Sequence, residues 1–497
     1  MNHIIVGIIL LLVSGTGYFF AWKFFKAKKI IFSILLLMFG GFILRLYVAS
    51  DQYLHPWDER YHAVVAKNMI NDPLKPMLYK DPGLPHEYKN WTMSHIWLHK
   101  QPFPLWMMAL SIKTFGTKEI AVRIPSILLT TMGILIIFLL GKSLYNERVG
   151  LISAFLYSIN GLLIEITGGR IATDHIDVAF QFFILLAIYF ALKFSKTNLI
   201  YYNIFCGISI GVAILSKWLP ALIVLPIWLI FMHSTKEHKK LGVLLNFLIL
   251  LAVTSIIFLP WQIYIFKVFP EEAKWESLYN IKHITGSLEG HGQPFYYFFN
   301  MIRINYGELI YLPLLWFFYT LIRKWQDPSR WVLAIWFVVP VLFFSFVQTK
   351  MQAYILFTAP AIFIISALFW DHLYYYRLRF KYKLLNYSVM FLLLALPYRY
   401  MIERVKPFEK GERNPVWASE LKNFSREISQ QPKTVLFNTS YPVEIMFYTG
   451  ISAYNHCPSV QTIKELAVKG YKIYLDDNDL PVKLQNLPEV SIIKLSR

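Results

Sequence analysis

The segment His55–Tyr61 contains two adjacent carboxylates, Asp58 and Glu59, shortly after a long apolar stretch. A carboxylate at a membrane surface can take the proton of a hydroxyl acceptor or hold a metal ion. Asp58 could instead cap the helix that is predicted to continue through residues 63–70. The two roles are compatible, because a cap holds a carboxylate rigidly.

Two further segments place charges beside apolar stretches. Lys100 precedes two prolines, and it could anchor the chain at the interface or bind a lipid phosphate. Residues 168–177 carry Arg170, Asp174 and Asp177 at the start of another apolar stretch. Charges in such a place are costly unless they pair or line a wet cavity. A structural Arg–Asp pair and a functional site are therefore both open readings of this segment.

Further cations lie between or inside apolar stretches, namely Lys217, Lys350 and Arg123. On the topology predicted from the loop charges, these three lie on the outer face together with Lys100 and Arg170. Five cations at one membrane level exceed what anchoring needs, and the positive-inside rule works against them there. A shared phosphate or diphosphate lipid would explain them.

Histidines in the two long polar loops are candidate metal ligands. His99, His283 and His291 could join Asp58 or Glu59 around a divalent metal ion. No spacing among them is diagnostic, and hydrogen-bonded surface histidines are the alternative. No other cofactor is indicated, because the sequence contains neither a Walker A motif nor a glycine-rich nucleotide loop.

The composition is that of a membrane protein. Of the 497 residues, 56% are hydrophobic and 16% are charged, and the mean hydropathy is +0.45. A soluble chain carries about 25% charged residues, so a polytopic membrane protein is expected, and disorder, coiled coils and disulfide scaffolds are excluded. The net charge of +19 is attributed to basic cytoplasmic loops rather than to nucleic-acid binding.

About twelve apolar stretches are near membrane-spanning length. The first, Ile4–Trp22, lacks charges and is followed rather than preceded by lysines, so we expect an uncleaved span with its N-terminus outside. The run Phe103–Phe115 is short and could lie along the interface. The predicted spans are 4–22, 30–49, 119–140, 149–168, 174–192, 199–216, 218–232, 241–262, 306–322, 331–347, 353–370 and 384–400.

The connecting loops alternate in charge. One set is short and carries 18 basic against 4 acidic residues, so it is predicted to be cytoplasmic. The other set includes the long loops 50–118 and 263–305, which are then outside. The short basic loops are 23–29, 141–148, 193–198, 233–240, 323–330 and 371–383.

The composition becomes polar after residue 400. Strand-like runs at 434–438, 452–455, 472–475 and 491–495 alternate with helical patterns around 442–449 and 459–469. The sequence thus predicts a transmembrane domain over 1–400 and a small extracytoplasmic α/β domain over 401–497. Most polar residues are therefore predicted to lie outside the cytoplasm, where there is no ATP. An enzyme with this topology would need an activated substrate presented by the membrane.

The order of the charged motifs resembles the bacterial protein-mannosyltransferase-like and aminoarabinose (lipid A) transferase-like membrane glycosyltransferases of the GT-C fold. The resemblance covers residues 50–370. The motifs that carry it are Asp58-Glu59-Arg60-Tyr61, Lys100-Gln101-Pro102, Phe115-Gly116 with Ala121-Val122-Arg123-Ile124-Pro125-Ser126, Arg170-Ile171-Ala172-Thr173-Asp174, Leu215-Ser216-Lys217 and Lys350 with Tyr354-Ile355-Leu356. One difference is His99, where aminoarabinose transferases usually carry Glu.

The resemblance implies roles for these residues. Asp58 would activate the acceptor, with Glu59 and Asp174 as further acidic catalytic residues. The donor phosphate would contact Lys100, Arg170, Lys217, Lys350 and Tyr354. His99 and His283 remain the candidates for a metal.

The function implied is transfer of a sugar from a polyprenyl-phosphate donor to a lipid, glycan or protein acceptor, with inversion. The expected location is the bacterial inner membrane, with the active site on the periplasmic side. The alternatives are a transporter or flippase of lipid-linked saccharides and a non-catalytic binding protein. A transporter favours inverted repeats and polar sites within its spans, whereas this sequence has no repeat and few charges within its spans.

Overall fold

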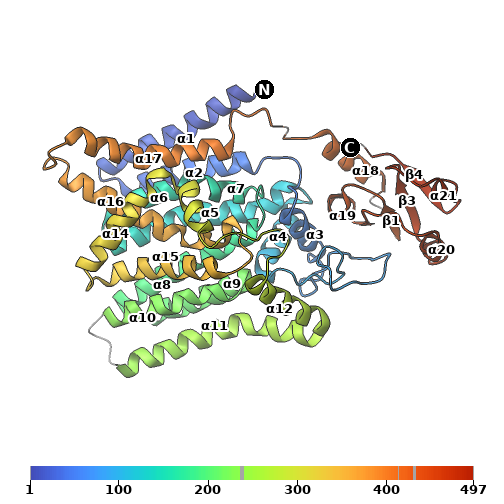
Figure 1. Cartoon of the computed structure of the whole chain (residues 1–497), viewed down its shortest axis with the longest axis horizontal. Helices are drawn as coiled ribbons and strands as arrows, with labels where there is room; N and C mark the ends of the chain where they lie inside the picture. The colour runs from blue at the N-terminus through green and yellow to red at the C-terminus, as the bar shows by residue number, and fades with distance from the viewer. Residues whose placement is uncertain (1, 235–239, 412, 429–432, 496–497) are drawn as a thin grey trace.

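The computed structural model describes residues 2–234, 240–411, 413–428 and 433–495. A bundle of long helices makes up most of the molecule, and a small α/β region lies beyond one end of it (Figure 1). The predicted basic loop at 233–240 falls largely outside the described residues. The predicted basic loops 323–330 and 371–383 lie at the end of the bundle away from the α/β region (Figure 1).

Nine helices within the described residues are long and apolar enough to cross a membrane. They confirm a polytopic helical fold, which is expected because a helix satisfies its own backbone polar groups in lipid. These are α1 (His3–Lys26), α2 (Ile30–Val48), α5 (Glu119–Leu144), α8 (Asp174–Thr197), α9 (Ile200–Lys217), α11 (Lys240–Val268), α15 (Pro328–Phe346), η3 with α16 (Gln352–Thr358 and Ala359–Tyr376) and α17 (Lys383–Val405).

The three remaining predicted spans are also helical, but each is short or bent. The pair α6 (Glu147–Ser158) and α7 (Gly161–Thr167) bends by 52°. The stretch 218–232 forms η1 (Leu219–Ile223) with α10 (Val224–Ser234), and the stretch 306–322 forms η2 (Glu308–Ile310) with α14 (Tyr311–Arg323). Twelve crossings therefore remain a prediction, although each predicted stretch is largely helical.

Small residues allow neighbouring helices to approach closely. A Cβ on Gly141 of α5 would lie 3.0 Å from the Cα of Gly150 on α6. A Cβ on Gly17 of α1 would lie 3.3 Å from the Leu36 carbonyl oxygen on α2. The α1–α2 pair is also joined by Ser33, whose hydroxyl donates to the Ala21 carbonyl at 2.8 Å.

The long loops fold at the end of the bundle nearest the α/β region (Figure 1). The first contains α3 (Asp58–Asn68) and α4 (Pro102–Phe115), and the second contains α12 (Pro270–Thr285) and α13 (Tyr297–Tyr306). The run predicted to lie along the interface is thus helix α4. Its Phe103 ring packs edge-on against Phe183 of α8 at 5.2 Å, so α4 packs against the bundle.

The C-terminal region contains a four-stranded parallel sheet with strand order β2-β1-β3-β4. The strands match the predicted runs, and β1 is fully buried, as a central parallel strand should be. Helix α18 had not been predicted. The elements are α18 (Val416–Ile428), β1 (Thr434–Phe437), α19 (Pro442–Thr449), β2 (Ser452–Ala453), α20 (Val460–Val468), β3 (Lys472–Asp476), α21 (Val482–Gln485) and β4 (Val490–Ile493).

This region docks on helix α3. The Arg60 guanidinium lies 3.1 Å from the Glu444 carboxylate on α19, and the Lys67 ammonium donates to the Phe447 carbonyl. The first outer loop and the α/β region also share one apolar core. Helix α3 is therefore held by the α/β region on one side and by the bundle on the other.

Candidate active site

Asp58 is the first residue of α3, and it lies partly open at the outer end of the bundle. Trp57, rather than Asp58, occupies the N-cap position. The Asp58 carboxylate accepts the N–H of Thr173 at 2.7 Å and lies 3.7 Å from the Lys100 ammonium, with 13% of its side chain exposed. Burial raises the pKa of Asp58, but Lys100, His62 and the Thr173 N–H outweigh it and hold the pKa well below its usual range. Asp58 is an ionised and reachable carboxylate.

A second carboxylate–lysine pair lies beside the first. The Lys217 ammonium at the end of α9 forms an ion pair with Asp177 of α8, and it sits 4.6 Å above the Tyr354 ring centre. Thr173 links the two pairs, because its N–H donates to Asp58 and its carbonyl accepts the N–H of Asp177. The predicted residues Asp58, Lys100, Lys217 and Tyr354 are thus brought together.

The backbone beside these residues is strained. Trp57, Thr173 and Trp218 have φ angles of 77°, 62° and 82°, in the left-handed region that costs a non-glycine residue about 1–3 kcal/mol. Each adjoins a charged residue of the site, namely Asp58, Asp174 or Lys217. Strain of this kind persists only where surrounding contacts hold it, and it concentrates at functional sites.

Glu59, in contrast, is sealed inside the protein. Its carboxylate receives two hydrogen bonds from Arg123, at 2.7 and 2.9 Å, and a third from the His55 N–H at 2.7 Å. A Cβ on Gly169 would lie 2.3 Å from a Glu59 oxygen, so the carboxylate lies directly against a glycine backbone. Burial raises the pKa of Glu59, but Arg123 outweighs it and keeps the pKa below its usual range.

Arg123 also binds the backbone of the first outer loop. Its guanidinium donates to the carbonyls of Ala49, Asp51 and Tyr53, and the side chain is fully buried. The Glu59–Arg123 pair therefore ties α3, α5 and the preceding loop together. No donor group of Arg123 points to a ligand-accessible surface.

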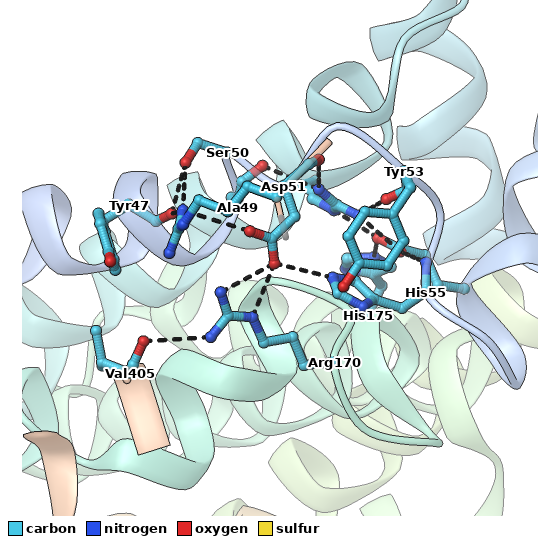
Figure 2. Close-up of polar contacts among 12 residues, drawn as sticks. Tyr47, Ala49, Ser50, Asp51, Tyr53, His55, Arg170, His175 and Val405 are labelled. Atoms are coloured by element: carbon cyan, nitrogen blue, oxygen red, sulfur yellow. Dashed lines mark hydrogen bonds and ion pairs between the residues drawn. The ribbon is translucent and has the colours of Figure 1, made fainter. Parts of the chain in front are cut away.

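Arg170 lies against an acidic partner that is distant in sequence. Figure 2 shows its guanidinium facing the Asp51 carboxylate, with nitrogen–oxygen distances of 3.0 and 2.9 Å. The same guanidinium donates to the Val405 carbonyl at 3.3 Å. His55 approaches Asp51 from the other side at 3.2 Å. The Arg–Asp pair considered for residues 168–177 thus exists, but its acidic member is Asp51.

Asp174 and Lys350 also have partners within the protein. Asp174 is fully buried and bonds to the Nδ1 atom of His62 at 2.9 Å. Lys350 is 4% exposed and donates to the Gln293 carbonyl at 2.9 Å. Burial lowers the pKa of Lys350. Lys350 thus holds the second outer loop against the bundle.

The two histidines predicted for a metal lie in the two outer loops, His99 in the first and His283 on α12 of the second. His99 stacks on Trp91 at 4.7 Å and lies 3.4 Å from the Glu276 carboxylate. Burial, followed by the charges of His99 and Lys100, lowers the pKa of His283 to about 4. Across the described ranges, no three His, Cys, Asp or Glu side chains converge as a metal site, and a metal at His99 and His283 stays a prediction.

Sequence reasoning gave no role to Glu289, which joins the two outer loops. Its carboxylate accepts from the Trp91 indole at 2.9 Å and from the Tyr279 hydroxyl at 2.8 Å. Glu289 itself has a φ angle of 53°. The only sequence signal was its position before Gly290, a residue type that tolerates left-handed backbone.

The molecule resembles solved membrane transferases. ArnT from Cupriavidus metallidurans bound to undecaprenyl phosphate aligns with a TM-score of 0.63 and 15% identity, over 88% of each chain. The oligosaccharyltransferase AglB from Archaeoglobus fulgidus, in complex with an inhibitory peptide and a dolichol-phosphate, aligns with a TM-score of 0.54 and 14% identity, over 86% of this chain and 64% of AglB. The chain has the GT-C fold.

Sequence comparisons point the same way for this GT-C chain. Residues 99–264 match the family described as dolichyl-phosphate-mannose-protein mannosyltransferase. An undecaprenyl phosphate-alpha-4-amino-4-deoxy-L-arabinose arabinosyl transferase of Pseudomonas fluorescens is 27% identical over 54% of this chain and 49% of its own length. The Proteus mirabilis enzyme is 25% identical over 67% and 58%. The matches thus span about half the length of these curated relatives.

Proposed function

We propose that this chain is an inverting glycosyltransferase that takes a sugar from a polyprenyl-phosphate donor on the periplasmic side of the bacterial inner membrane. The observation that carries the proposal is the ionised, partly exposed Asp58 beside Lys100, with Lys217 adjacent. It pairs a base with cations suited to a phosphate. The GT-C fold shared with ArnT bound to undecaprenyl phosphate supports the same donor class.

The proposed reaction is a single displacement. The acceptor hydroxyl oxygen attacks the anomeric carbon, and the bond from that carbon to the phosphate oxygen breaks. The polyprenyl phosphate leaves with the electron pair, and Lys100 and Lys217 stabilise its charge. Asp58 receives the acceptor's proton. The transition state has oxocarbenium character.

The other predicted phosphate ligands contact other groups. Arg170 pairs with Asp51, and Lys350 donates to the Gln293 carbonyl. The Tyr354 ring lies beneath Lys217, which also pairs with Asp177. We therefore assign first contact with the donor phosphate to Lys100 and Lys217, and the lining of the donor cavity to Tyr354.

The acceptor is proposed to approach past the α/β region. We propose that residues 1–400 form the transmembrane domain and that the extracytoplasmic residues 401–497 shape access for the acceptor, because α19 packs against the helix that carries Asp58. A lipid such as lipid A, another lipid-linked glycan or a protein would fit an acceptor hydroxyl at this membrane level.

The test is donor turnover by the purified protein in nanodiscs. A panel of polyprenyl-phosphate sugars is supplied with crude membrane lipid and periplasmic extract as acceptor sources, and free polyprenyl phosphate is measured. We expect release with at least one donor, and none from a Lys100→Met, Lys217→Met double variant. Movement of a donor between leaflets without release would contradict the proposal and favour a flippase.

A further inference from the structure

A buried histidine–carboxylate pair lies directly behind Asp58. His62 is one helical turn after Asp58 on α3, so both side chains share one face of the helix. The His62 Nδ1 atom is 2.9 Å from an Asp174 carboxylate oxygen, and both side chains are fully buried. The residue before Asp174, Thr173, donates its N–H to Asp58. The start of α8 therefore contacts both Asp58 and His62.

The hydrogen bond determines which ring nitrogen can accept a proton. Because an ionised carboxylate only accepts, the His62 Nδ1 atom carries the hydrogen in this pair. The Nε2 atom then holds a lone pair, and it is buried without a hydrogen-bond partner among the residues described. Burying an unpaired acceptor is unfavourable. Such a group is expected where a proton arrives during function.

We propose that His62 is a positioning residue that relays the acceptor's proton away from Asp58. The inference rests on the proposed function. As the acceptor oxygen bonds to the anomeric carbon and the phosphate departs with the electron pair, the proton passes to Asp58 and then to the His62 Nε2 atom. Asp174 stabilises the resulting imidazolium and holds the ring, as the carboxylate does in a Ser-His-Asp triad.

The relay resolves a conflict in the site. Lys100, His62 and the Thr173 N–H hold the pKa of Asp58 low, although burial opposes them. They keep the carboxylate ionised, but they also make its protonated form unfavourable. An imidazole that is paired with a carboxylate is a stronger base than the Asp58 carboxylate. The spacing of four residues on α3 puts the His62 ring on the same face of the helix as Asp58.

The charged groups near the ring lie on α8, on α3 and just before α4. Asp174 on α8 contacts it, Asp58 lies on its own helix, and Lys100 sits beside Asp58. Arg60 and Lys67 are also on α3, but they pair with α19 of the α/β region. The ring therefore lies between one direct carboxylate and the Asp58–Lys100 pair.

The deciding experiment is the pH–rate profile of His62→Asn. Asparagine keeps an N–H for Asp174 but cannot accept a proton. We expect kcat to fall about 10- to 100-fold, with an unchanged donor KM and an unchanged unfolding temperature. A proton already on Nε2 blocks the relay, so the wild-type profile should have an acidic limb that the variant loses. If His62→Asn has the kcat of the wild type and keeps the acidic limb, the relay is overturned.

A second variant guards against a purely structural effect. Asp174→Asn keeps the volume but donates to Nδ1, so the hydrogen moves to Nε2 and the relay is blocked. The same loss of kcat and of the acidic limb is expected. If both variants lower the unfolding temperature and leave the shape of the profile unchanged, His62 is structural and the relay fails. If the wild type turns over no donor, the proposed function itself fails.

Discussion

Two carboxylate–cation pairs begin at neighbouring residues of α3, and they differ in burial and in spacing. Glu59 and Arg123 are fully buried, with hydrogen bonds of 2.7 and 2.9 Å. Asp58 and Lys100 are partly exposed and 3.7 Å apart. In the first pair the donors are used by the carboxylate and by loop carbonyls. In the second pair, the Lys100 ammonium and one carboxylate oxygen remain available to a substrate.

The difference teaches which pair is built for structure and which for chemistry. A saturated buried pair resists change, because removing one partner leaves an uncompensated charge. A loosely spaced pair near solvent contributes little to stability but can bind a phosphate and take a proton. The predictions below test this division.

Removing one partner of the Glu59–Arg123 pair should have the largest effect on stability. Glu59→Gln or Arg123→Met leaves one buried group unpaired, so we expect a loss of about 3–5 kcal/mol in unfolding free energy. Denaturant unfolding in detergent measures it. The double variant Glu59→Leu, Arg123→Met should recover part of the loss. Single variants that unfold as the wild type does would show that the pair is not structural.

The same pair predicts a pH dependence. The pKa of Glu59 is below its ordinary value in the folded protein, so its stabilisation is fully present above the unfolded pKa of about 4.3 and is lost as the pH falls further. Unfolding should therefore become easier below about pH 4. Glu59→Gln should show a flatter dependence in that range. Equal slopes for the variant and the wild type would contradict the assignment.

The open site should respond in binding rather than in stability. Lys100→Met and Lys217→Met each remove a charged donor to the phosphate, worth about 1.5–3 kcal/mol. We expect the donor KM to rise about 10- to 100-fold, with little change in unfolding temperature for Lys100→Met, whose partner Asp58 is partly exposed. Lys324→Met, in a loop at the opposite end of the bundle, is the matched control. An unchanged donor KM in both site variants would refute their role.

The smallest effect is expected at the far side of α3. Arg60→Met leaves Glu444 buried alone, but burial already raises the pKa of Glu444, so this carboxyl can take up a proton. We expect a loss of about 1 kcal/mol in stability and a few-fold fall in kcat through misplacement of α3. Glu444→Gln should behave similarly. A kcat loss as large as that of a site variant would mean that the α/β region acts directly in the reaction.

The bundle could be predicted well from sequence, because apolar stretches of spanning length have one stable form in lipid. The predicted stretch 119–140 lies within α5, and the predicted 442–449 coincides with α19. Helix α18 was missed, since it lies in a polar segment where no apolar run marks it. The division at residue 400 falls inside α17, which continues to Val405.

The site could be predicted only in part. Lys100 was selected for its place before prolines, and it does lie beside Asp58. The sequence could not reveal that Arg123 is used by Glu59, that Arg170 faces Asp51, or that Asp174 holds His62. These partners are far apart in the chain, and residue type alone carries no information on pairing. Counting five free outer cations therefore overestimated the charge available to a ligand.

The most direct test of the account is single-turnover transfer by Asp58→Asn. The account predicts that transfer falls about 10²- to 10⁴-fold, while donor binding and the unfolding temperature stay at wild-type values. Asp72→Asn, in the same outer loop and exposed, is the matched control and should transfer normally. Transfer by Asp58→Asn within twofold of the wild type would contradict the assignment of Asp58 as the base.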